Sequence, residues 1–125
     1  MEGLPEDEKR LHILNFLKDF KELMGQGQYW VKGHQKNLQA LAELGLTERQ
    51  REEYILSLSV EDYVAGPIRD ELKPGDYWVF GRNIGNIEVY IKLKLIQTRN
   101  DDEKAVCLSF HAAERPLKYP LKKSK

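Results

Sequence analysis

Polar side chains that could do chemistry alternate with apolar ones along two neighbouring segments, EVYIKLKL and AVCLSFH. In a strand, successive side chains point to opposite faces, so each segment predicts one apolar and one polar face. If the two strands pair antiparallel with every apolar residue on one side, Tyr90 lies opposite His111 and Lys92 opposite Ser109. A sheet covered on one face has no packing reason to collect these four residues on the other.

One interpretation of that polar face is a site for metal-independent RNA cleavage. The reaction requires a base for the 2′-hydroxyl proton, an acid for the leaving 5′-oxygen, and cations for the charge that builds on phosphorus. Histidine suits proton transfer near neutral pH. We interpret His111 as the proton-transfer residue, Tyr90 as the residue that shares or orients that step, and Lys92 as the phosphate ligand. The pattern leaves open an alternative, in which a structural histidine and a solvated lysine face water.

The apolar residues of the same segments predict the strand register. Three pairs are expected, namely Leu95 with Val106, Leu93 with Leu108, and Ile91 with Phe110.

A third strand is predicted over residues 77–82, with a hairpin turn at 83–86 where Asn and Gly allow positive φ. The expected neighbours across this hairpin are Trp78 with Ile91, Phe80 with Val89, Tyr77 with Lys92, and Val79 with Tyr90. An antiparallel meander over residues 77–112 follows.

The first sixty residues predict three helices that precede any strand. The first runs over 5–24, with Pro5 in its first turn and apolar residues at three- and four-residue spacing, namely Leu11, Leu14, Leu17, Phe20 and Met24. The second covers about 35–44 and ends at Gly45, and the third begins at the capping box TERQ. The order predicts a single α+β domain over 1–125, with N-terminal helices packed on one face of a small antiparallel sheet.

Composition narrows the class of protein. The chain has 125 residues, 41% of them hydrophobic and 32% charged, with a net charge of zero. This length can bury a core, and the balanced charge argues against coating nucleic acid by bulk electrostatics. No apolar run approaches the ~18 residues of a membrane span, and the acidic start lacks the features of a signal peptide. We therefore expect a cytoplasmic protein without a membrane partner.

Metal and cofactor chemistry is not expected. His12, His34 and His111 fall in separate predicted elements, and Cys107 is the one cysteine. Too few ligands converge for a metal site, and no intramolecular disulfide can form.

Basic residues suggest an anion-binding patch around the polar face. His34, Lys36 and Asn37 cluster at the start of the second helix, where they either cap it or contact a phosphate. The tail over 115–125 is basic and carries no acid. On its own such a tail is typical of a solvated terminus. Beside the polar strands, the residues expected to bind RNA are Lys94, Arg82, Lys36 and Arg115.

Several segments are similar to one known family: LAELGLT, LSLSVEDY, the Trp78 strand, EVYIKLKL and AVCLSFH, with GP, WVFG and SFHAAERPLKYP shared by a closer subgroup. They resemble the MqsR toxins of bacterial type II toxin–antitoxin systems, relatives of the RelE-like mRNA interferases. The resemblance implies a RelE-like fold, ribosome-independent cleavage of mRNA, and control by a cognate antitoxin.

Carried over position by position, Tyr90 matches the family's functional tyrosine and Lys92 the lysine two residues later. His111 stands where the family has a functional lysine. Val64 and Val79 replace a lysine and a glutamine of the family site, so part of its polar set is missing. The alternative that follows is a non-catalytic RelE-like module that binds RNA or a protein partner through the same face.

Overall fold

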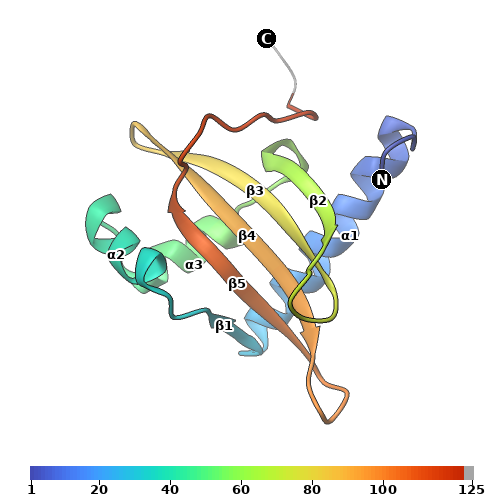
Figure 1. The fold of residues 1–125 in the computed structure, drawn as a ribbon, viewed down its shortest axis with the longest axis horizontal. Helices are drawn as coiled ribbons and strands as arrows, with labels where there is room; N and C mark the ends of the chain where they lie inside the picture. The colour runs from blue at the N-terminus through green and yellow to red at the C-terminus, as the bar shows by residue number, and fades with distance from the viewer. Residues whose placement is uncertain (123–125) are drawn as a thin grey trace.

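A computed structural model describes residues 1–122 of the protein. Its helices and strands follow in the order α1 (Glu6–Gly25), β1 (Tyr29–Val31), α2 (Gln35–Leu44), α3 (Glu48–Leu56), the 3₁₀ turn η1 (Val60–Asp62), β2 (Tyr63–Arg69), β3 (Asp76–Ile84), β4 (Ile87–Gln97) and β5 (Glu103–Ala112). The five strands form one sheet in the order β1-β5-β4-β3-β2, antiparallel except where β1 runs parallel to β5 (Figure 1). The predicted meander is therefore the centre of a larger sheet.

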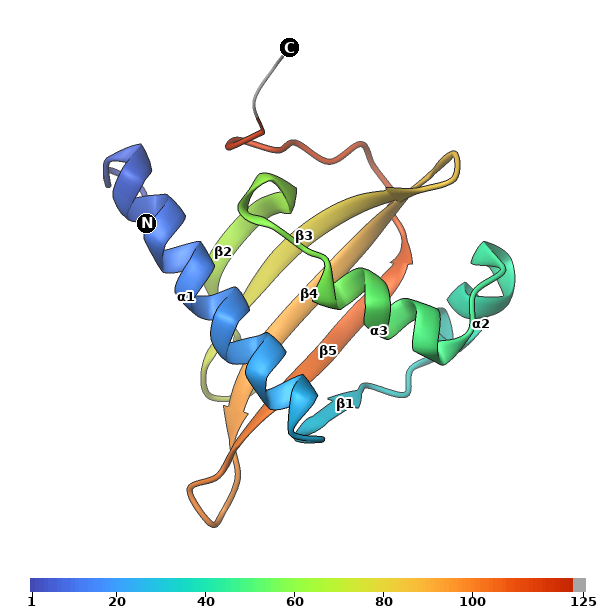
Figure 2. The ribbon, with the colours of Figure 1, turned by 180° about the vertical axis from the view of Figure 1, so that it is seen from behind.

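Helices α1 and α3 lie across one face of this sheet, which confirms the predicted α+β class (Figure 2). Helix α1 buries Ile13, Phe16, Leu17 and Phe20. Phe16 stacks on Trp78 with ring centroids 4.8 Å apart. Burying each such side chain contributes about 1.5–3 kcal/mol, so this layer supplies much of the stability of the fold.

The β3–β4 hairpin is tighter than the sequence predicted. Its turn has two residues, Gly85 and Asn86, and Gly85 takes a φ of 62°. Such two-residue turns with positive φ match the twist of the flanking strands. The register consequently shifts by two residues, which places Trp78 opposite Leu93 and Phe80 opposite Ile91. A shift of two leaves every side chain on its expected face.

The β4–β5 pairing confirms the predicted register from Tyr90 to Lys92 and corrects it from Leu93 onward. Tyr90 lies opposite His111, Lys92 opposite Ser109, and Ile91 opposite Phe110. Between Lys92 and Leu93 the register shifts, because Leu108 is an extra residue in β5. Such a β-bulge reverses the alternation beyond it. The strand pairs there are Leu93 with Cys107 and Leu95 with Ala105, so Cys107 faces the core where Val106 was expected.

Asn37 of α2 holds this bulge from the side of the sheet. β1 pairs with Ala105–Cys107 and ends there. Beyond it the Asn37 side chain, 1% exposed, donates from Nδ2 to the carbonyls of Lys32 (2.9 Å) and Leu108 (3.0 Å). Its Oδ1 accepts from the amide of Phe110 at 2.8 Å. One side-chain amide thus provides the hydrogen bonds that a neighbouring strand would otherwise give.

Strand β2 was not predicted, because Gly66-Pro67 reads as a break in the chain. The structure places this dipeptide inside an edge strand whose pairing with β3 is irregular. Proline is tolerated at a sheet edge, where its missing N–H removes no ladder hydrogen bond.

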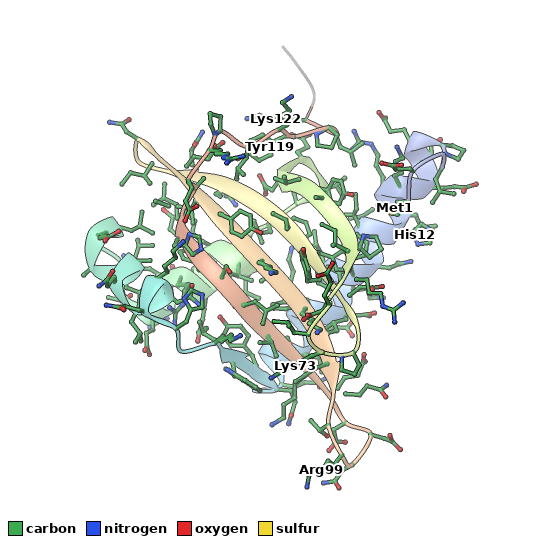
Figure 3. All side chains as sticks on the ribbon, in the orientation of Figure 1. Met1, His12, Lys73, Arg99, Tyr119 and Lys122 are labelled. Carbon is green, nitrogen blue, oxygen red and sulfur yellow. The ribbon has the colours of Figure 1, made fainter. Side chains whose placement is uncertain are left out.

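The outer face of the sheet, away from α1 and α3, is only partly open. At one end, the β2–β3 loop brings Asp70 to the buried Lys94. At the other end, residues 113–122, which include Tyr119 and Lys122, cross the sheet (Figure 3). The Leu117 amide and the Tyr119 hydroxyl each donate to the Glu88 carboxylate at 2.8 Å. The predicted basic tail is therefore packed on the sheet as far as it is described, and Lys123 and Lys125 lie outside the described residues.

Candidate functional site

A hollow of about 420 Å³ opens on the outer face, where β4 and β5 meet the start of α2 and the C-terminal segment. Its lining residues are Lys36, Tyr90, His111, Glu114, Arg115 and Leu117. Four of the seven predicted site residues therefore gather at one place. They come from three parts of the chain that are distant in sequence.

The rings of Tyr90 and His111 stack at the centre of this hollow. Their centroids are 5.5 Å apart and their planes differ by 21°. His111 Nδ1 lies 3.0 Å from the carbonyl oxygen of Ala112. Since a carbonyl only accepts, Nδ1 carries the hydrogen and Nε2 is left free for proton transfer.

Tyr90 is suited to donate a hydrogen bond and not to act as a base. Burial, and to a smaller extent the nearby Tyr77, raise its pKa above the ordinary value. The phenol therefore stays protonated at neutral pH.

Lys92 lies two residues beyond Tyr90 along β4, on the same face. Its Nζ is 4.0 Å from the centre of the Tyr77 ring, a distance at which cation and ring attract each other. The predicted neighbourhood of Tyr77 and Lys92 is confirmed, although the contact is diagonal because Tyr77 pairs directly with Lys94. The Tyr77 ring thus fixes the ammonium group on the outer face of the sheet, and Lys92 is not one of the residues that line the hollow.

The rim of the hollow carries more positive than negative charge. Lys36 forms an ion pair with Glu114, and the hydrogen bond from Lys36 is the main reason that the pKa of Glu114 is lowered. Arg115 is the second cation of the rim. Two cations face one carboxylate, so the hollow favours an anionic ligand that competes with Glu114 for them.

Lys94 and Arg82 are not part of this site. Lys94 is 2% exposed and its Nζ lies 2.7 Å from Asp70 Oδ2, a hydrogen bond that lowers the pKa of Asp70 to about 2. Arg82 follows the alternation of Phe80 onto the helix-covered face, where it donates to Ser57 Oγ at 2.9 Å. The predicted role of these two side chains in RNA binding does not fit this placement.

His34 is a neighbour of the site that the sequence named only as part of a helix-start cluster, as a cap or a phosphate contact, and not as a partner of His111. It precedes α2, and its ring centroid lies 6.2 Å from that of His111 with the rings edge to face. His34 Nε2 is 3.2 Å from the carbonyl oxygen of Leu108. The cluster with Lys36 was the available signal, but nothing local indicates that α2 docks beside the end of β5.

Two other chemistries find no support in the geometry. Burial raises the pKa of the Cys107 thiol to about 12, which leaves too little thiolate for a nucleophile. Among the histidine, cysteine and acidic side chains of residues 1–122, no group of three or more is arranged to hold a metal ion.

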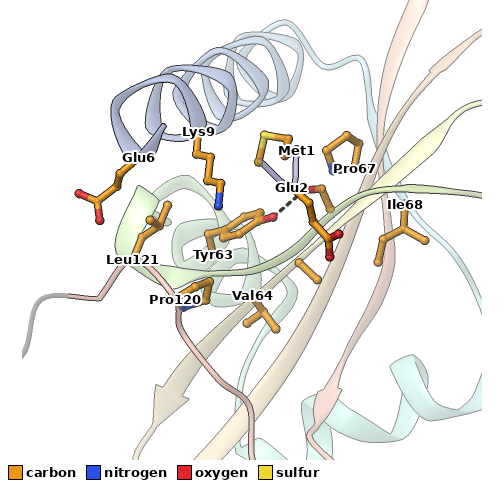
Figure 4. A pocket seen from close by; sticks show the side chains of 12 residues that line it. Met1, Glu2, Glu6, Lys9, Tyr63, Val64, Pro67, Ile68, Pro120 and Leu121 are labelled. Atoms are coloured by element: carbon orange, nitrogen blue, oxygen red, sulfur yellow. Dashed lines mark hydrogen bonds between the residues drawn. The ribbon is translucent and has the colours of Figure 1, made fainter. Parts of the chain in front are cut away.

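A larger hollow of about 890 Å³ lies elsewhere, between the start of α1, strand β2 and the end of the described chain (Figure 4). Its lining includes Glu2 and Glu6, and the Tyr63 hydroxyl there donates to the carbonyl of Gly66 at 2.6 Å. Val64, at a position where the resemblance to MqsR toxins leads us to expect a lysine, also lines it. The lining includes no histidine, and its two carboxylates, Glu2 and Glu6, outnumber its one lysine, Lys9, which disfavours an RNA phosphate. The smaller hollow is therefore the candidate site.

Comparison of the chain with protein-family models, with curated proteins and with solved structures found no match. The class of protein is therefore described by its fold and its site alone. It is a small α+β protein in which a histidine and a tyrosine stack in a hollow rimmed by cations. Within residues 1–122, none of the helices has the length and apolar character needed to cross a membrane.

Proposed function

We propose that the protein is a metal-independent endoribonuclease that cleaves mRNA in the cytoplasm, as the toxin of a toxin–antitoxin system. The observation that carries this proposal is the stack of His111 on Tyr90 inside a hollow rimmed by Lys36 and Arg115. The resemblance to MqsR toxins supplies the substrate, mRNA, and the partner, a cognate antitoxin.

In the proposed reaction, the scissile phosphate binds at the open side of the Tyr90–His111 stack. His111 Nε2 removes the proton of the 2′-hydroxyl, and the 2′-oxygen attacks phosphorus. The bond to the 5′-oxygen breaks, which leaves a 2′,3′-cyclic phosphate and a 5′-hydroxyl that takes up a proton. The protonated Tyr90 hydroxyl and the Lys92 ammonium stabilise the charge on the phosphoryl oxygens.

The direct test is incubation of the purified protein with mRNA in the presence of a chelator. We expect cleavage to 2′,3′-cyclic phosphate ends, with a loss on the order of 10²–10⁴-fold in His111→Ala. Tyr90→Phe keeps the ring stack and removes only the hydroxyl, so its loss should be smaller. His12→Ala is the matched control, because His12 is exposed on α1, away from the hollow (Figure 3).

An absence of cleavage by the wild type, or equal cleavage by His111→Ala, would refute the enzyme proposal. Expression in bacteria should arrest growth, and a small neighbouring gene product should relieve the arrest. His111→Ala should not arrest growth.

One observation favours the second candidate, a non-catalytic module that binds RNA or a protein through the same face. Val79 is 4% exposed and lies directly opposite Lys92, so the residue paired with Lys92 has no polar group where the MqsR family has a glutamine. Binding without cleavage would support this candidate. A steep loss of affinity with added salt would then identify RNA, because neutralised phosphates release counterions.

A further inference from the structure

Two histidines from distant parts of the chain meet beside the end of β5. His34 precedes α2 and His111 lies near the end of β5, yet their ring centroids are 6.2 Å apart. The third histidine, His12, lies on α1 on the other side of the molecule (Figure 3). The fold therefore brings His34 next to His111, which lines the hollow, although His34 itself is not one of the lining residues.

Each of the two rings has one nitrogen bound to a backbone carbonyl. His34 Nε2 lies 3.2 Å from the Leu108 oxygen, and His111 Nδ1 lies 3.0 Å from the Ala112 oxygen. These nitrogens must donate, so His34 Nδ1 and His111 Nε2 are the atoms left for proton transfer. A backbone carbonyl that orients an imidazole in this way is a common support for acid–base histidines.

The carbonyl that orients His34 is itself held in place. It belongs to Leu108, the extra residue of the β-bulge, and it also accepts from Asn37 Nδ2 at 3.0 Å. Asn37 is 1% exposed and additionally accepts from the Phe110 amide. His34 therefore bonds to a carbonyl that a buried side chain, Asn37, also holds.

The simplest structural role for His34 would be to cap α2. However, its side chain makes no capping hydrogen bond to the helix. The ring instead turns toward β5 and His111. The side chain thus contacts β5 and His111 and not the first turn of the helix.

We infer that His34 is the second catalytic residue, the acid that protonates the leaving 5′-oxygen. The inference rests on the proposed ribonuclease function and adds to it a two-histidine mechanism. His111 Nε2 takes the 2′-hydroxyl proton as the bond from the 2′-oxygen to phosphorus forms. The bond to the 5′-oxygen breaks, and His34, which enters the reaction as the imidazolium with hydrogens on both nitrogens, gives its Nδ1 proton to that oxygen. One proton is taken up and one is released, so the balance closes without a co-reactant.

The decisive experiment uses an RNA whose scissile 5′-oxygen is replaced by sulfur. A thiolate leaves without protonation, so this substrate does not need the acid. The variant is His34→Gln, whose amide can still donate to the Leu108 carbonyl. We expect it to cleave ordinary RNA on the order of 100-fold more slowly than the wild type, and the sulfur substrate at nearly the wild-type rate. His111→Ala should be slow on both substrates, and His12→Gln should match the wild type on both.

The pH dependence gives an independent readout. A mechanism with one base and one acid predicts a bell-shaped rate profile. Loss of the acid should remove the fall in rate at high pH in His34→Gln while keeping the fall at low pH. A merely structural role for His34 would lower the rate without changing the shape.

The outcomes separate the two proposals. Equal slowing of His34→Gln on both substrates, or an unchanged rate on both while His111→Ala is inactive, overturns the role of His34 and leaves the ribonuclease function standing. Failure of the wild type to cleave either substrate overturns both.

Discussion

Replacing Asn37 with alanine should destabilise the protein strongly although only one small side chain is changed. The substitution removes three hydrogen bonds, two donated by Nδ2 and one accepted by Oδ1. The carbonyls of Leu108 and Lys32 retain other donors, the His34 ring and the His34 amide. The amide of Phe110 retains none of its partners and becomes a buried, unsatisfied donor.

These losses can be added to an approximate free energy. Leaving the Phe110 amide unsatisfied costs about 1–3 kcal/mol, and each of the other two hydrogen bonds contributes about 0.5–1.5 kcal/mol. The expected loss for Asn37→Ala is therefore roughly 2–6 kcal/mol, a large part of the ~5–15 kcal/mol typical of a folded domain.

Equilibrium unfolding in urea measures this loss. Asn15→Ala is the matched control, because Asn15 is exposed on α1 and its change should stay within about 0.5 kcal/mol. Asn37→Asp is a sharper variant, since it keeps the acceptor for Phe110 and replaces the donor with an oxygen that faces two carbonyls. A loss below about 0.5 kcal/mol for Asn37→Ala, or a fully stable Asn37→Asp, would show that this side chain does not hold the bulge.

Two further perturbations test the cover of the outer face. A Cβ at Gly81 would lie 2.6 Å from Leu117 Cδ1, so Gly81→Ala should displace the C-terminal segment. Limited proteolysis would detect this displacement as faster cleavage after residue 118. Gly33→Ala is the control, because a Cβ at Gly33 meets nothing within 4 Å. Asp70→Asn should lower the Tm at neutral pH, because it removes the carboxylate partner of the buried Lys94. The pKa of Asp70 is lowered to about 2 in the folded protein, so its contribution is present above the ordinary pKa near 3.8 and is lost as the pH falls toward 2. The Tm difference between wild type and Asp70→Asn should therefore narrow over this range, and a constant difference would contradict the role of the pair.

Local patterns were enough to predict the helices and the central strand pair. Capping signals and glycine stops act within a few residues, and α3 begins at the predicted Thr47 capping box. Alternation has a period of two in any strand, so Tyr90 opposite His111 could be derived without knowledge of the fold.

The spacing of apolar residues could not determine which side of helix α1 is buried, because α1 carries apolar residues on more than one side. Leu11 and Leu14 have helical spacing but are 57% and 51% exposed, because the fold places Ile13 and Phe16 against the sheet instead. A stripe of apolar residues indicates that a helix is amphipathic, and only its packing partner determines which stripe is buried.

The composition of the site was decided by contacts between distant segments. Lys94 is removed from the surface by the β2–β3 loop, and His34 is brought to His111 by the docking of α2 on the bulge at Leu108. Both outcomes depend on hydrogen bonds between residues far apart in the chain, which no local pattern encodes. The sequence by itself determined that Tyr90 and His111 face each other, and the tertiary structure decided which charged groups and which second histidine surround them.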